Sequence, residues 1–486
     1  MRTLVAATPL VCTMLVLSCD SDDYSPGSLP DGGPDTGVIP DPDTILPRVL
    51  SLSPSDGEIN VSVRTPIQVV FSEAVKLGTT PLTLLANGIP VATSISLSAD
   101  GTTLTVTPTA NIPLPTNMSV NFKDITDLRG NALIRPPWSW TSPLWLPIGT
   151  PLDTGGFKLP VIAAGPGEVV TVLSVKNNDS AGYLDLVRNQ IAGPTSTWMG
   201  RGSLGPTEAG RGAAVVDKDG AFVNAYLAKG NHIAVMRDGV RYPNVPDFPI
   251  ASTGGVALAV DEHGILFLAC DIVWPDGSRH VAATALSRGS EDWTSLGAAT
   301  VLENDVHLSS LTLDQKGTPY LAYLDSSNNA RVRVWRNGSW LPLGSPLNIE
   351  SEQVTDLAIA LDSSANVYAL VSFADRFLPR YRVQILRFDG TSWIACGPEI
   401  SEDKLDGVIF FARMGNDHIF AYFGTSPNVE VLDVTRNGWT RIPPPAMARL
   451  SARLSGGMGA IDPEGVPVIA WEHSTSGELQ VVRLNR

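Results

Sequence analysis

The stretch Val332-Arg-Val-Trp-Arg-Asn-Gly-Ser-Trp-Leu-Pro-Leu-Gly344 decides the fold of most of this chain. Its first five residues alternate apolar and polar side chains, which is the period of a half-buried β-strand. Asn337-Gly338 follows, and this pair supplies the positive φ angles of a two-residue hairpin turn. The chain then returns through Trp340 towards Gly344. The stretch therefore predicts an antiparallel hairpin whose outer strand carries a large aromatic ring.

This aromatic residue recurs along the chain as an anchor that is followed by an apolar residue and a turn. The anchors are separated by 53, 44, 51, 47, 53 and 46 residues, and they are Trp145, Trp198, Tyr242, Trp293, Trp340, Trp393 and Trp439. In each complete repeat unit, three further β-like runs precede the anchor. Before Trp340 these runs are residues 311–313, 320–323 and 332–336. Repeats of about 40–50 residues with four antiparallel strands are typical of β-propeller blades.

The ends of the repeat predict how its sheets close. Trp145 precedes the first complete set of three runs, whereas the last set, residues 461–483, has no anchor after it. We therefore expect Leu144–Gly149 to pair with Val481–Leu484, which also removes an exposed sheet edge. The predicted fold is all-β, with residues 143–486 forming a seven-bladed β-propeller closed by the N- and C-terminal strands. An irregular β-solenoid or two separate sheets are the alternatives.

Residues 48–142 lack this repeat and predict an Ig-like β-sandwich, because short β-like runs alternate with turn residues. Four blocks resemble the bacterial Ig-like domain of surface-layer proteins (the SbsA type): residues 53–61, 70–75, 104–108 and 125–131. The resemblance implies a spacer or adhesion module without catalytic groups, although Met118 stands where the family often has Tyr. Glu73, Asp124 and Asp127 lack the spacing of calcium ligands, so we interpret them as turn and capping residues.

Residues 1–19 predict export. A short basic start precedes an apolar run from Leu4 to Leu17, which is too short to remain as a membrane span. Val16-Leu-Ser-Cys19 resembles the lipobox of bacterial lipoproteins, a family that usually has Leu where Val16 stands. The resemblance implies cleavage before Cys19 and acylation of that residue, and several acyl chains together anchor a protein stably. The alternative is an ordinary signal peptide with an incidental Cys19.

Residues 20–47 contain seven Asp, no Lys or Arg, and many Gly, Pro and Ser. They can bury too little apolar surface to fold, so we expect a disordered acidic tether. The formal net charge of −15 argues against binding to nucleic acid and against charge-driven binding to anionic lipid. We therefore expect a bacterial cell-envelope protein that meets the membrane only through its lipid anchor. The sequence leaves open whether the inner or the outer membrane holds it.

No motif predicts a metal, a cofactor or a catalytic centre. The six histidines are scattered, and residues 200–205 match GxGxxG without the following helix that a dinucleotide fingerprint needs. Cys270 and Cys396 lie on strand-like runs and are expected to be buried free thiols, with a disulfide between them as the alternative. We therefore expect no cofactor and favour a non-catalytic protein. The alternatives are a carbohydrate-active hydrolase or lyase with carboxylates near the propeller axis, and a purely structural envelope component.

The predicted binding surface consists of the loops between the second and third strands of the units, because these loops differ while the strands agree. Residues 273–279 and 374–380 are the longest of them. Trp and Arg are the residue types that most often dominate binding energy. The candidate binding residues are Trp274, Asp276, Arg279, Arg376, Phe377 and Arg380, with Asp325 as a weaker candidate. The alternative is that these are solvated loops of a scaffold. The expected partner is an envelope protein or a glycan.

Overall fold

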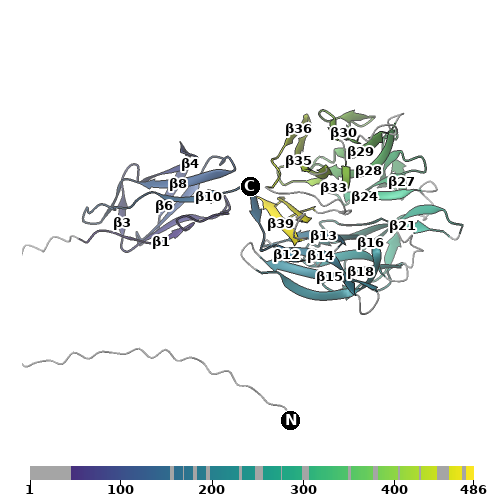
Figure 1. Ribbon diagram of the computed structural model, residues 1–486, viewed down its shortest axis with the longest axis horizontal. Coiled ribbons are helices and arrows are strands. Elements are labelled where there is room, and N and C mark those ends of the chain that lie inside the picture. The colour runs from purple at the N-terminus through teal and green to yellow at the C-terminus, as the bar shows by residue number, and fades with distance from the viewer. Residues whose placement is uncertain are drawn as a thin grey trace, which may run out of the picture. The chain divides into compact units, whose positions relative to one another are not determined.

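The regular secondary structure of the described residues consists of β-strands. A computed structural model describes residues 45–153, 158–167, 169–178, 183–192, 197–228, 232–246, 255–274, 276–297, 306–347, 352–375, 381–402, 405–425, 428–445, 459–472 and 478–486. Within these ranges, all assigned secondary-structure elements are β-strands and none is a helix. No helix among them is long and apolar enough to cross a membrane. Residues Leu46–Arg486 group into one unit, which Figure 1 shows with many of its strands labelled.

Two four-stranded sheets form the domain at residues 49–142. One has the order β1 (Val49–Ser53), β2 (Ile67–Phe71), β7 (Thr103–Pro108) and β6 (Thr93–Leu97), the other β10 (Trp138–Ser142), β8 (Thr116–Phe122), β4 (Leu82–Ala86) and β5 (Ile89–Pro90), and β3 (Val75–Leu77) pairs with β9 (Ile125–Asp127). Burial alternates along β2, because successive side chains of a strand point to opposite faces. The buried core includes Val69, Phe71, Leu84, Leu104, Met118, Val120 and Trp138.

Six further sheets occupy residues 145–484 of the described chain. Their strands are β11 (Trp145–Pro147), β12 (Leu152–Asp153), β13 (Lys158–Gly165), β14 (Val169–Asn178), β15 (Tyr183–Ala192), β16 (Met199–Val216), β17 (Phe222–Ala228), β18 (His232–Arg237), β19 (Val240–Arg241), β20 (Val256–Val260), β21 (Leu266–Val273), β22 (Arg279–Leu286), β23 (Trp293–Ser295), β24 (His307–Leu313), β25 (Pro319–Leu324), β26 (Ala330–Arg336), β27 (Ser339–Pro342), β28 (Glu352–Leu361), β29 (Val367–Asp375), β30 (Tyr381–Phe388), β31 (Trp393–Ala395), β32 (Ile400–Glu402), β33 (Leu405–Arg413), β34 (Ile419–Thr425), β35 (Asn428–Thr435), β36 (Gly438–Arg441), β37 (Gly459–Ile461), β38 (Pro467–Glu472) and β39 (Glu478–Leu484). Three four-stranded sheets follow chain order, β20–β23, β24–β27 and β33–β36; the sheet β28–β31 also holds β32.

One sheet differs from the repeat expected from the sequence, because it contains the seven strands β13 to β19. Its long strand β16 pairs with β15 through residues 199–207 and with β17 mainly through residues 212–216. A register shift separates Thr207 from Gly212 on the β17 side. The glycines of this segment permit such a bend in place of a separate turn. The GxGxxG match at residues 200–205 therefore lies inside a strand.

The anchor tryptophans link each sheet to the one before it. In five of them the indole N–H donates to a backbone carbonyl just after the preceding anchor: Trp145 to Pro443 (2.7 Å), Trp198 to Thr150 (2.7 Å), Trp340 to Leu296 (2.9 Å), Trp393 to Leu343 (3.1 Å) and Trp439 to Pro398 (3.1 Å). A sixth anchor, Trp293, has its ring centroid 6.4 Å from that of Tyr242. A Trp ring suits this position, because it is largely apolar and carries one polar N–H. The indole of the first anchor, Trp145, thus bonds to the segment that follows the last anchor, Trp439.

The glycine that ends the anchor motif has a steric role. Gly344 has a φ of +74°, and a Cβ there would lie 2.9 Å from Nε1 of Trp393, the next anchor. Gly397 repeats this arrangement with a φ of +93° and 2.8 Å to Nε1 of Trp439. The glycine of one unit therefore leaves room for the tryptophan of the next.

The first and last strands of the repeat pair as the sequence predicts. Strand β11 is antiparallel to β39, with Trp145 opposite Leu484 and Pro147 opposite Val482. The first strands of successive units touch in the order β13, β16, β20, β24, β28, β33 and β37, and β37 also touches β13. The order of contacts between units thus returns to its starting strand.

Candidate functional site

The predicted binding loop between β21 and β22 is held by its own backbone. The Trp274 N–H donates to the carbonyl of Ser278 (2.9 Å), and the Gly277 N–H donates to the carbonyl of Trp274 (2.8 Å). The Trp274 ring centroid lies 5.1 Å from that of His280, and the side chain packs against the core of its sheet. Trp274 is therefore half-buried and fixed in orientation, with part of its surface exposed.

A hydrogen-bonded chain runs from Asp276 through Ser278 to His280. The Oγ of Ser278 lies 2.5 Å from Oδ1 of Asp276 and 2.9 Å from Nε2 of His280. The hydrogen bond from the Ser278 side chain is the main cause that lowers the pKa of the Asp276 carboxyl, so this exposed group is ionised at neutral pH. His280 is only 3% exposed, and its Nδ1 has no hydrogen-bond partner among the described residues. The loop presents a carboxylate at its tip and holds an imidazole below it.

Arg279 connects this loop to the neighbouring sheet. It is the first residue of β22, and its Nη1 lies 3.4 Å from Nδ1 of His307, the first residue of β24. The Val306 N–H also donates to the Arg279 carbonyl (3.4 Å). The structure thus brings Trp274, Asp276 and Arg279 together on one hairpin, and Arg279 extends to a second sheet.

Asp325 lies in the equivalent hairpin of the next sheet, between β25 and β26. Its Oδ1 accepts the N–H groups of Ser327 and Asn329 (2.9 Å each), and the Nε of Arg331 donates to its Oδ2 (2.7 Å). Burial alone would raise the pKa of this carboxyl, but the hydrogen bonds from Arg331 and Asn329 outweigh it and lower the pKa. Asp325 is therefore an ionised group that orients its own turn.

Four sequence-predicted residues lie outside the described ranges: Cys19, Arg376, Phe377 and Arg380. The last three fall between the end of β29 at Asp375 and the start of β30 at Tyr381. Their roles in anchoring and binding stay predictions from the sequence.

Buried acids elsewhere stabilise turns. In Asp127, for example, Oδ1 accepts the N–H groups of Arg129 and Asn131 (2.8 Å each), as expected of a capping residue.

Cys270 and Cys396 are free and buried, as predicted, and burial raises the pKa of both thiols. Within the described ranges, no three His, Cys, Asp or Glu side chains form a group that could hold a metal ion.

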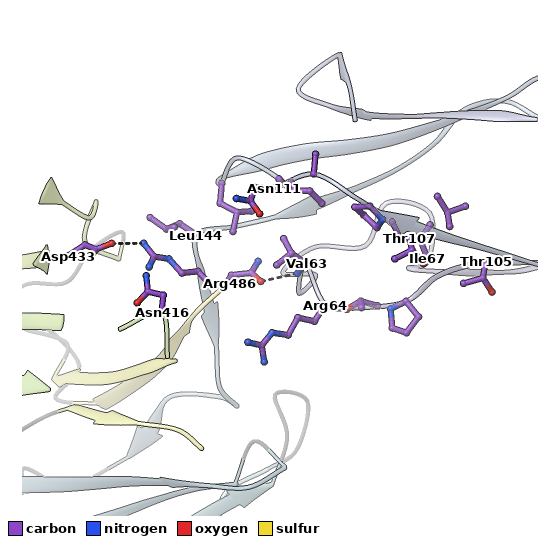
Figure 2. Close-up of a pocket in the computed structure, with 18 residues that line it drawn as sticks. Val63, Arg64, Ile67, Thr105, Thr107, Asn111, Leu144, Asn416, Asp433 and Arg486 are labelled. Atoms are coloured by element: carbon purple, nitrogen blue, oxygen red, sulfur yellow. Dashed lines mark hydrogen bonds and ion pairs between the residues drawn. The ribbon is translucent and has the colours of Figure 1, made fainter. Parts of the chain in front are cut away.

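A second site was not predicted from the sequence. A cleft of about 950 Å³ lies between the loop before β2 and the C-terminal residues, and we call it the junction cleft (Figure 2). Its polar lining residues are Arg64, Thr65, Thr105, Thr107, Asn111, Asn416, Asp433, Asn485 and Arg486, and its apolar ones include Ile67, Ile112, Leu114 and Leu144. These residues come from six separate parts of the sequence, and no periodicity or motif marks them.

Asn485 fixes the two sides of the junction cleft. This side chain is fully buried; its Oδ1 accepts the Val63 N–H (2.9 Å), and its Nδ2 donates to the carbonyls of Val61 (3.2 Å) and Pro143 (2.8 Å). The Asn485 N–H also donates to the Leu144 carbonyl (2.8 Å). One amide therefore joins the first domain to the final strand of the repeat.

Comparison with known proteins assigns a family to the first domain. Residues 43–142 match the family model described as a bacterial Ig-like domain, which confirms the predicted resemblance at that level. A search of curated proteins finds no match to this chain.

Solved structures with a similar β-rich fold include several carbohydrate-related proteins. A lectin of Aleuria aurantia in complex with Fucalpha1-6GlcNAc is 14% identical over 60% of this chain and 97% of its own, with a TM-score of 0.40. Polysaccharide lyase Uly1 is 9% identical over 67% of this chain and 89% of its own, with a TM-score of 0.43. A Hadza microbial sialidase is 11% identical over 79% of this chain and 76% of its own, with a TM-score of 0.40. Similarity at this level carries no argument about the ligand.

Proposed function

We propose that this chain is a bacterial cell-envelope lipoprotein that presents a seven-bladed β-propeller on an Ig-like domain and binds a glycan or an envelope protein without catalysis. The observation that carries the binding role is the hairpin of Trp274, Asp276 and Arg279. Its aromatic, acidic and basic groups are held in place before any ligand arrives, which lowers the entropic cost of binding.

Three observations support the propeller. The first strands of the units touch in an order that returns to its start, with β37 against β13. The indole of Trp145 bonds to Pro443, so the bonds between successive units also join the first unit to the last. Pairing of β11 with β39 gives the final sheet its outer strand. A ring of blades gives every apolar strand a neighbour on both sides.

The sequence and the family match support the envelope location. Cys19 follows an apolar export signal, and seven Asp residues separate it from the folded residues. The bacterial Ig-like family at residues 43–142 is consistent with a spacer between anchor and propeller. Labelling of cells with an alkyne fatty acid should mark the chain, and Cys19→Ala should abolish the label while Cys270→Ala keeps it. A label that persists in Cys19→Ala would contradict the anchor.

Binding can be tested with the full chain on an array of bacterial envelope glycans, together with affinity capture from envelope extract. Arg279→Gln should weaken the affinity for the bound partner at least about tenfold, which corresponds to a binding free energy of about 1.4 kcal/mol. Arg436→Gln is the matched control, because Arg436 is exposed in the turn between β35 and β36. Equal binding by both variants would refute the site. Cleavage of a bound glycan would instead support the hydrolase or lyase, and absence of any partner would favour a structural component.

A further inference from the structure

We propose that the junction cleft is a second binding site, distinct from the Trp274 hairpin, and that it takes an oligosaccharide carrying carboxylate groups. This inference goes beyond the proposed function, since it names a different site and a ligand chemistry. It rests on the volume of the cleft, its fixed walls, its polar lining and the position of Arg64 in that lining.

The volume and rigidity of the cleft fit a ligand site. Its volume of about 950 Å³ lies within the range of about 300–1,000 Å³ that ligand pockets span. Such pockets occur preferentially at domain interfaces. The bonds of Asn485 to Val61, Val63 and Pro143 hold the two walls together, so the cleft exists before a ligand binds.

The charges of the cleft favour an anionic ligand. Asp433 is already engaged, because its Oδ1 lies 2.7 Å from Nδ1 of His418 and its Oδ2 lies 3.4 Å from Nη2 of Arg486. Arg64 is exposed and forms no ion pair with an acid among the described residues. Figure 2 shows this side chain extending from the loop before β2, with Asn416, Asp433 and Arg486 contributed by the other wall. A guanidinium can bind a carboxylate through two parallel hydrogen bonds.

The uncharged lining favours a sugar over other acids. Besides Asn485, whose amide is already bonded to the two walls, three threonines and two asparagines line the cleft: Thr65, Thr105, Thr107, Asn111 and Asn416. Hydroxyl and amide groups both donate and accept hydrogen bonds, which matches the hydroxyl groups of a sugar. Apolar walls such as Leu114 and Leu144 suit the C–H faces of sugar rings. A carboxylated oligosaccharide would contact the Arg64 guanidinium, the hydroxyl and amide groups, and the apolar walls at the same time.

Titration of the full chain with tetragalacturonate tests this proposal, with its fully methyl-esterified form as the uncharged control. We expect the acidic form to bind at least tenfold more tightly than the ester. Arg64→Gln should remove most of this preference, and Asn111→Asp should weaken binding by placing an anion in the cleft. Arg48→Gln is the matched control, because Arg48 is an exposed arginine of the same domain that does not line the cleft.

The outcomes separate this proposal from the function proposed above. Equal losses in Arg64→Gln and Arg48→Gln would mean non-specific charge attraction and would overturn the site. Loss of binding in Arg279→Gln but not in Arg64→Gln would place the ligand on the Trp274 hairpin instead. Tight binding of tetra-aspartate but not of tetragalacturonate would also refute the proposal. An unchanged melting temperature shows that a variant is folded, and Arg64→Lys, which keeps the charge, should retain part of the affinity.

Discussion

Replacement of Gly344 by Ala tests the contact that joins neighbouring sheets. The new methyl group would lie 2.8 Å from Cε2 of Phe388 and 2.9 Å from Nε1 of Trp393, so both rings must move. Movement of Trp393 also disturbs its bond to the Leu343 carbonyl (3.1 Å). Gly338→Ala is the matched control, since its φ of +75° is nearly the same as the +74° of Gly344 but nothing lies within 4 Å of its new methyl group.

The two variants share the backbone cost of a left-handed alanine, about 1–2 kcal/mol. Only Gly344→Ala adds the crowding, which costs about 1–3 kcal/mol in a packed structure. We therefore expect Gly344→Ala to lower the free energy of unfolding by about 1–3 kcal/mol more than Gly338→Ala does. The measurement is the urea midpoint of unfolding at equilibrium, with tryptophan fluorescence as the probe.

A double-mutant cycle identifies the partner of the new methyl group. In a Trp393→Phe background the indole N–H is absent, so Gly344→Ala should cost less than it does in the native chain. Equal unfolding midpoints for Gly344→Ala and Gly338→Ala would refute the steric role assigned to the anchor glycine.

Three further predictions follow from buried or hydrogen-bonded groups. Asn485→Ala leaves the Val63 N–H and two carbonyls without their partner, so we expect a loss of about 1–3 kcal/mol and faster hydrogen exchange at Val63. Backbone N–H bonds from Ser392 and Thr391 lower the pKa of Asp389 to about 2 from 3.8, so its stabilising effect is complete above pH 3.8 and is lost as the pH falls through about 2; NMR titration should show this midpoint, and Asp389→Asn should remove it. Cys270 and Cys396 should resist a thiol reagent such as DTNB until urea unfolds the chain, because both are buried.

The sequence by itself determined the local structure of this protein. Alternation and the Asn337-Gly338 turn predicted a hairpin that the structure contains as β26 and β27, with φ angles of 52° and 75° at the turn. The ends of the repeat, with an anchor before the first set of runs and none after the last, predicted the pairing of Trp145 with the final strand. These features depend on neighbours in the chain or on a regular repeat, and such signals are visible in one sequence.

The tertiary structure alone decided which distant residues meet. The sequence marked Trp393 and Gly344 as parts of two separate motifs, but only the packing of two sheets shows that one makes room for the other. It nominated Asp325 for binding, whereas the structure shows its carboxylate bonded within its own turn. Arg64 and Asn485 belong to no pattern, and they line one cleft because Asn485 bonds to Val61 and Val63, more than 400 residues earlier. Contacts between residues so far apart depend on how whole domains pack, and a short sequence pattern carries no record of that packing.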